Sequence, residues 1–237
     1  FRTHESMRSV PAVLRDQGVR TGLLGKSHIA PESVYPFEVN KPGIAMARRE
    51  MRQAAADFLA ETQGDPFYLH VGISYPHRNG THFRTEPFAE HFGDDEVFYD
   101  HDEVPVPDFL PDTPETREDL AGYYQYVSRF DTMVGDVLDA LEQSGRAKDT
   151  LIFVTSDHGM PFPGAKATNF DTGHRCPLLI AHPEGGSETH SQALVNWLDF
   201  APTFFDWLNV PADAAPDDLP GRSLLPILGQ SEPDGFD

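Results

Sequence analysis

The sequence predicts an α/β protein whose mostly parallel sheet is covered by helices on both faces. Short apolar runs with the composition of buried strands alternate along the chain with longer segments of helical periodicity. Polar residues that can bind metal ions or anions follow directly after several of these apolar runs. Because ligands of such sheets bind outside the carboxyl ends of the strands, we expect these polar residues to form one site.

Four apolar runs are predicted to be strands: residues 19–24, 66–74, 151–154 and 176–181. Helical spacing of apolar residues over 6–17 and 44–62 predicts two helices, each followed closely by a glycine that can end it. A third helix of about 30 residues is predicted to start at Thr113, a good N-cap, with Pro114 at its first position. A further helix is predicted to begin near Asp199.

Three segments lack these patterns. Residues 31–42 contain three prolines and are predicted to be a loop. Residues 79–112 are polar, acidic and proline-rich, and a connection of this length predicts a lid or a substrate-binding insertion. Three histidines within it are expected to be solvated or structural: His82, His91 and His101. Residues 211–237 form an acidic tail rich in proline and glycine.

The composition excludes some classes of partner but does not identify the compartment. The formal net charge of −20 over 237 residues argues against a nucleic-acid or anionic-membrane binder, because long-range repulsion would oppose both. The single cysteine, Cys176, excludes an internal disulfide and leaves the redox compartment open. The chain has no initiator Met and enters directly into a helical pattern, so we expect a fragment of a longer protein.

The chemistry is concentrated at three strand ends and one adjoining loop. The residues concerned are Lys26, His28, His77, Asp157, His158 and Lys166. Aspartate and histidine suit a divalent cation such as Ca²⁺, Mg²⁺, Mn²⁺ or Zn²⁺, and lysines can neutralise a tetrahedral oxyanion. A histidine can also protonate a leaving group near pH 7. The pattern therefore indicates metal-assisted hydrolysis of a phosphate or sulfate ester or amide, without choosing between them.

A family resemblance makes that choice. Residues 21–28, TGLLGKSH, resemble the G-K-x-H motif of the sulfatases. Residues 66–77 resemble the sulfatase strand that ends in Pro-His, and residues 155–159 resemble the second metal motif of the family. The resemblance runs in order over nearly the whole chain and is strongest to the sulfamidases. The segments that carry it there are 19–37, 75–78, 113–120, 128–131, 159–163 and 221–226.

The resemblance implies a role for each candidate residue. Asp157 and His158 would be two ligands of a Ca²⁺ ion, while Lys26 and Lys166 would bind sulfate oxygens. His77 would protonate the leaving nitrogen or oxygen. His28 would assist turnover of the sulfated intermediate. The adjacent pair His174 and Arg175 would contact the substrate, an N-sulfated or O-sulfated sugar.

The resemblance also implies what lies outside this chain. The nucleophile of the family is a formylglycine made from the Cys or Ser of a C/S-x-P-x-R motif, and we expect it upstream of Phe1 together with the remaining metal ligands. We expect Cys176 to be a buried structural thiol in a strand. Residues 1–237 would then be the central part of a sulfatase catalytic domain, without the small C-terminal sheet and inactive alone. The full-length protein could form a homodimer in a periplasmic, secreted or lysosomal-type compartment.

Two other interpretations stay open on the sequence. The alkaline-phosphatase-like phosphoester hydrolases share the broad fold and also place Asp-His at this strand end. A derivative that binds sulfated glycans without catalysis would keep the same charges.

Overall fold

The strands form two groups in the computed structural model of the chain, which describes residues 2–62, 64–83, 88, 90–185, 189–231 and 233. The first group is a parallel sheet in the order β2-β1-β3, made of Val39–Lys41, Arg20–Gly25 and Phe67–Gly72. The second group pairs β4, Ile152–Thr155, with β5, Leu178–Ala181. The four predicted strands are thus confirmed, and their predicted ends differ from the observed ones by no more than two residues.

The helices follow the predicted periodicity. In chain order the α-helices are α1 (Val10–Asp16), α2 (Arg48–Thr62), α3 (Pro114–Gln143), α4 (Asp171–His174) and α5 (Phe200–Trp207). The described residues also form the 3₁₀ turns η1 (Gly93–Asp95), η2 (Ala147–Asp149), η3 (Trp197–Asp199) and η4 (Leu225–Ile227). As predicted, the Thr113 side chain accepts a hydrogen bond at the start of α3, and Pro114 occupies the first turn. None of the helices among the described residues has the length and apolar character needed to cross a membrane.

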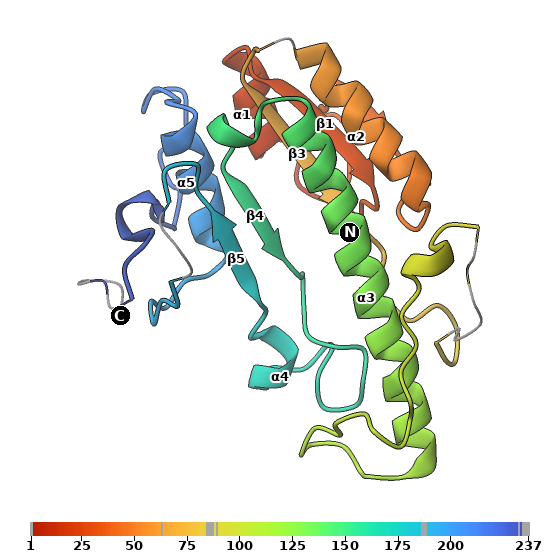
Figure 1. Cartoon of the computed structure of the whole chain (residues 1–237). Helices are drawn as coiled ribbons and strands as arrows, with labels where there is room; N and C mark the ends of the chain where they lie inside the picture. The colour runs from red at the N-terminus through yellow and green to blue at the C-terminus, as the bar shows by residue number, and fades with distance from the viewer. Residues whose placement is uncertain are drawn as a thin grey trace.

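Helices cover both faces of the parallel sheet, which confirms the predicted fold class (Figure 1). Leu24 and Leu69 pack against the face formed by α2 and α3, together with fully buried Met51. On the other face α1 packs against the sheet alongside α5. There the Phe204 ring lies 5.6 Å from the Tyr68 ring of β3 and contacts β4 as well. Helix α5 therefore packs against a strand of each group.

Two details of the sheet differ from the prediction. Strand β5 runs antiparallel to β4, because the segment between them holds only the four-residue α4 and no helix long enough for a parallel crossover. Strand β2 lies inside the segment 31–42 that was predicted to be a loop. It is only three residues long, follows Pro36 and Phe37, and carries too few residues to show a period.

The segment 79–112 is anchored along α3. Phe83, Phe92, Val104 and Leu110 of this segment are buried in the main core. Arg129 of α3 donates to Glu96 at 2.6 Å in an ion pair whose side chains are only 4% and 3% exposed. A role of this segment in substrate binding stays a prediction.

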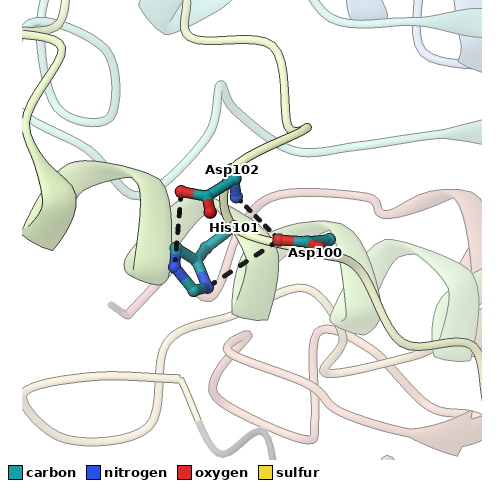
Figure 2. Close-up of side chains that lie close together, drawn as sticks. All are labelled: Asp100, His101 and Asp102. Carbon is teal, nitrogen blue, oxygen red and sulfur yellow. Dashed lines mark hydrogen bonds and ion pairs between the residues drawn. The ribbon is translucent and has the colours of Figure 1, made fainter.

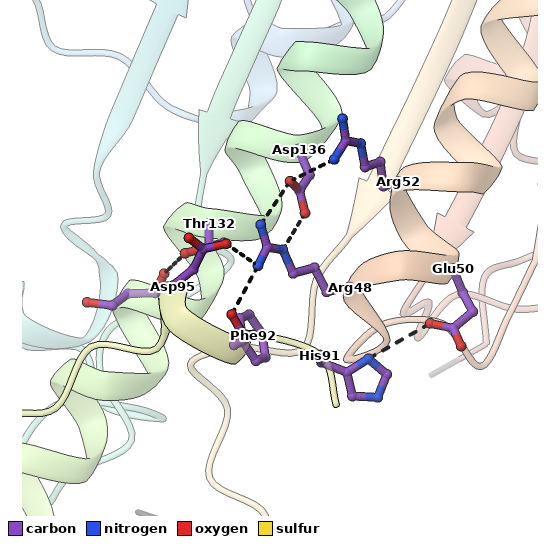
Figure 3. Close-up of polar contacts among 9 residues, drawn as sticks. Arg48, Glu50, Arg52, His91, Phe92, Asp95, Thr132 and Asp136 are labelled. Atoms are coloured by element: carbon purple, nitrogen blue, oxygen red, sulfur yellow. Dashed lines mark hydrogen bonds and ion pairs between the residues drawn. The ribbon is translucent and has the colours of Figure 1, made fainter. Parts of the chain in front are cut away.

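A second ion-pair network joins α2, α3 and η1 (Figure 3). The guanidinium of Arg48 donates to Asp136 at 2.6 Å and to Asp95 at 2.6 Å, and also reaches the Phe92 carbonyl. The hydrogen bond with Asp136 raises the pKa of Arg48 above its ordinary value. This network fixes the start of α2 against the middle of α3.

Replacing Gly72 by alanine should destabilise the fold by about 1–3 kcal/mol, because the new methyl group has no room. A Cβ at Gly72 would lie 2.1 Å from the Lys26 carbonyl oxygen, and this neighbour is backbone that cannot turn away. Gly135→Ala is the control, since Gly135 lies in α3 with nothing within 4 Å of its added Cβ. That substitution should stabilise by about 0.5–1 kcal/mol. Urea unfolding of both variants measures the difference, and an unaffected Gly72→Ala protein would contradict the close approach.

Candidate active site

Lys26 is placed at the carboxyl end of β1 by a tight backbone approach to β3. Its amide N–H donates to the Gly72 carbonyl at 2.7 Å, and the preceding Gly25 has a φ of +84°. A side chain at Gly25 would be strained in that conformation and would also meet the Gly72 oxygen at 2.3 Å. The two glycines let β1 and β3 end side by side, so that Lys26 leaves the sheet next to the segment that carries His77.

His77 and Lys166 meet although 89 residues separate them. The Lys166 ammonium lies 3.3 Å from Nε2 of His77 and can donate a hydrogen bond to it when the ring is neutral. Burial lowers the pKa of His77, and the positive charges of Lys166 and Lys26 lower it further. His158 acts in the same direction, while a hydrogen bond with the Arg78 backbone opposes the shift. Lys166 thus contacts His77, and Lys26 and His158 lie near enough for their charges to act on its ring.

Asp157 and His158 follow β4 in a turn that α4 supports. Nδ1 of His158 lies 2.8 Å from the Gly159 carbonyl oxygen, which can only accept, so Nδ1 carries the proton. Nε2 is then left with a free lone pair in the neutral ring, and it lies 3.5 Å from the Asp157 carboxylate. The Asp157 side chain is 77% exposed. One carboxylate oxygen and one imidazole nitrogen thus lie side by side at the end of β4.

The remaining candidates lie at the surface. His28 is exposed in the segment that follows Lys26. His174 and Arg175 are exposed at the end of α4, and Nδ1 of His174 donates to the Phe170 carbonyl at 2.7 Å. The turn that carries His174 and Arg175 lies close to Asp157 and His158, since the Gly159 N–H donates to the Gly173 carbonyl at 2.9 Å. No structural feature among the described residues assigns a role to these three side chains.

Cys176 differs from the expected buried strand residue. It is only half-buried and lies before β5, which begins at Leu178. Pro177 has no N–H to give to a strand partner, and its carbonyl instead accepts a hydrogen bond from Thr155 at 2.7 Å.

A second acidic group lies in the segment 79–112. Asp100, His101 and Asp102 are exposed, and Figure 2 shows the two carboxylates on either side of the imidazole. The Asp102 N–H donates to the Asp100 carboxylate at 2.9 Å, which is a common way to stabilise a turn. His101 is therefore solvated, as expected, and we assign no ligand to this group.

The turn after β3 carries the letters of the nucleophile motif, although the nucleophile itself is still expected upstream of Phe1. Residues 74–78 read Ser-Tyr-Pro-His-Arg, so the letters C/S-x-P-x-R do occur within the chain. Two residues of this stretch are already engaged, since His77 contacts Lys166 and Arg78 pairs with Asp119. No role was predicted for Arg78, although it lies in the segment 75–78 that carries the family resemblance. The signal that the sequence did offer is its position directly after His77.

Replacing Lys166 by methionine should raise the pKa of His77, because it removes the nearest of the two ammonium groups that oppose ring protonation. The ring pKa can be followed by NMR titration of its carbon-bound protons. Lys148→Met is the matched control, because Lys148 is exposed and lies in η2 before β4, away from the carboxyl strand ends. An unchanged titration of His77 in Lys166→Met would contradict the contact.

Fold and site together define an α/β protein with two groups of polar residues at the carboxyl ends of its strands. One is a cationic cluster of Lys26, His77 and Lys166, and the other is the candidate metal pair, Asp157 and His158. The family model described as Sulfatase matches residues 3–210, and the chain belongs to the sulfatase family. It is 37% identical to N-sulphoglucosamine sulphohydrolase of Homo sapiens over 98% of its own length and 52% of that protein. The chain thus spans about half the length of that relative, and the expected resemblance to the sulfamidases is confirmed.

Solved structures agree with the fold. One is a protein in complex with its substrate D-glucosamine-2-N,6-O-disulfate, with a TM-score of 0.71 and 18% identity over 100% of this chain and 67% of that one. Another is a phosphonate monoester hydrolase from Silicibacter pomeroyi, with a TM-score of 0.70 and 18% identity over 100% of this chain and 64% of that one. At this identity the two similarities concern the fold alone.

Proposed function

We propose that the chain supplies the anion-binding and acid-donating part of a sulfohydrolase that releases sulfate from N-sulfated or O-sulfated sugars. The observation that carries the proposal is the 3.3 Å contact of Lys166 with His77. The positive charge of Lys26 also acts on this ring and lowers its pKa. The identity with the human N-sulphoglucosamine sulphohydrolase favours N-sulfated glucosamine as the substrate class.

In this proposal the two lysines bind the sulfate and His77 acts on the leaving group. Lys26 and Lys166 neutralise the sulfate oxygens and turn toward them when substrate enters. The bound anion then offsets the two ammonium charges, so the pKa of His77 rises and the ring takes up a proton. Nε2, the ring nitrogen that contacts Lys166, donates that proton to the departing nitrogen or oxygen. His28, His174 and Arg175 are proposed to act on the intermediate and on the sugar.

The candidate metal pair fits one side of a calcium site. Ca²⁺ takes 6–8 oxygen ligands, and the exposed Asp157 carboxylate is a suitable donor, while the free Nε2 of His158 is a weaker one. Among the described residues these two belong to no group of three or more His, Cys, Asp or Glu ligands. We therefore propose that Asp157 and His158 hold Ca²⁺ together with ligands from other parts of the protein. When bound, Ca²⁺ would supply positive charge that attracts the sulfate. Formylglycine would supply the nucleophile.

The test is sulfate release by the full-length protein that carries this chain. N-sulfated glucosamine and 6-O-sulfated glucosamine are incubated with it, and free sulfate is measured by ion chromatography before and after removal of calcium with a chelator. Faster hydrolysis of nitrophenyl phosphate than of nitrophenyl sulfate would instead indicate a phosphoester hydrolase. Calcium-dependent binding of heparin fragments without any sulfate release would indicate a non-catalytic derivative.

A further inference from the structure

Arg78 lies between aromatic rings and is linked to two other segments of the chain. Its guanidinium carbon is 4.7 Å from the centroid of the Phe83 ring and 4.9 Å from that of Phe162. Its Nη2 donates to the Asp119 carboxylate at 2.5 Å and to the Pro161 carbonyl at 3.3 Å. The residue that directly follows His77 is thus held to α3 and to the loop after β4.

The loop that receives Arg78 is the one that carries Lys166. Within it the amide N–H groups of Phe162 and Lys166 both donate to the Met160 carbonyl, at 2.8 Å and 3.1 Å. The phenyl ring that contacts Arg78 and the ammonium that contacts His77 therefore belong to one closed turn. A shift of that turn relative to Arg78 would change the separation of Lys166 from His77.

His77 is held from both sides along its own segment. Before it, Tyr75 is 2% exposed, and its ring packs edge-on against those of Phe92 and Tyr126. After it, Arg78 pairs with Asp119, whose other carboxylate oxygen is buried and has no hydrogen-bond partner within the described ranges. Among the described residues, the ion pair with Arg78 is thus what offsets the cost of burying the Asp119 carboxylate of α3.

We infer that Arg78 is a positioning residue that holds His77 against Lys166 by tying the turn after β3 to α3 and to the loop 160–166. The inference rests on the proposed function of His77 as the proton donor. The task needs arginine rather than lysine, because a planar guanidinium can stack on two rings and donate in two directions at once, whereas an ammonium is a point charge.

The test compares Arg78→Lys with Arg117→Lys. Arg117 is a matched control, because it lies on α3, the helix of Asp119, and pairs with Asp112. It contacts the segment 102–112 rather than the loop of Lys166. In the chain itself, NMR cross-relaxation between the His77 ring protons and the Lys166 side chain should be present in the wild type and in Arg117→Lys. It should be lost in Arg78→Lys. Undiminished cross-relaxation in Arg78→Lys would overturn the inference.

In the full-length protein, Arg78→Lys should lower kcat by about tenfold or more with little change in KM, since displacement of a catalytic group by about 1 Å is costly. The loss should be smaller with nitrophenyl sulfate, whose leaving group needs no proton. If Arg78→Lys does not fold, Asp119→Asn replaces it, and that variant must show the same loss of cross-relaxation. Loss of cross-relaxation in a protein without sulfohydrolase activity would sustain the positioning role and reject the proposed function. Unchanged kcat would overturn the inference.

Discussion

Replacing His77 by alanine in the full-length protein should reduce turnover of the proposed substrate, N-sulfated glucosamine, by about 10²–10⁴-fold, the range expected when a general acid is lost. The nitrogen of the substrate leaves poorly unless it is protonated, and the His77 ring is the group that Lys26 and Lys166 surround. The loss should be far smaller with nitrophenyl sulfate, because nitrophenolate leaves without a proton. The comparison of the two substrates separates loss of the acid from loss of the fold.

The His77 substitution also has a matched control and a pH signature. His101→Ala removes an exposed imidazole of the acidic turn and should leave turnover unchanged. In the wild type, the pKa lowered in the free site should set the alkaline limb of kcat/KM, and activity should fall as pH rises through it. The same limb of kcat should lie at higher pH, because the bound sulfate raises the pKa of His77. Equal loss on both substrates would contradict the role of acid.

Replacing Glu96 by alanine should lower the free energy of unfolding by about 3–5 kcal/mol, the cost of breaking a buried ion pair by removing one partner. Glu96 accepts hydrogen bonds from Arg129 at 2.6 Å, from Gln125 at 2.9 Å and from the Phe88 N–H at 3.1 Å. The guanidinium of Arg129 also lies over four aromatic rings, so the substitution removes a buried carboxylate that balances its charge. Urea unfolding measures the loss.

The control for Glu96 is Asp149→Ala, which removes the exposed acid of a surface pair with Arg146 and should cost about 0–1 kcal/mol. Burial alone would raise the pKa of Glu96, but its three hydrogen bonds outweigh burial and lower the pKa below the ordinary 4.5. The stability due to ionised Glu96 is therefore complete above about pH 4.5 and is lost as pH falls through the lower folded value. Glu96→Gln should lack this acid-side loss, and an equal acid sensitivity would refute the argument.

The sequence predicts the long helix and the strand ends because local chemistry determines both. Thr113 and Pro114 fix the start of α3 through backbone capping alone. Lys26, His77 and Asp157 can be grouped from the sequence alone, because parallel strands and α/β loops bring their carboxyl ends to one edge.

Long-range pairing is what the sequence could not provide. The antiparallel direction of β5 depends on how the chain returns after α4, and β2 is too short to show a pattern. The anchoring of the segment 79–112 depends on the buried contact of Glu96 with Arg129, residues that look like surface charges when read singly. The same holds for Arg78, whose partners Asp119 and Phe162 lie 41 and 84 residues away.

The most direct test of the cationic cluster is to titrate inorganic sulfate into the protein and follow the His77 ring by NMR. A sulfate held by Lys26 and Lys166 should raise the pKa of His77, and chloride at equal ionic strength should not. Lys166→Met should weaken the response to sulfate. A pKa of His77 that responds identically to sulfate and chloride would contradict the claim that these residues form a sulfate site.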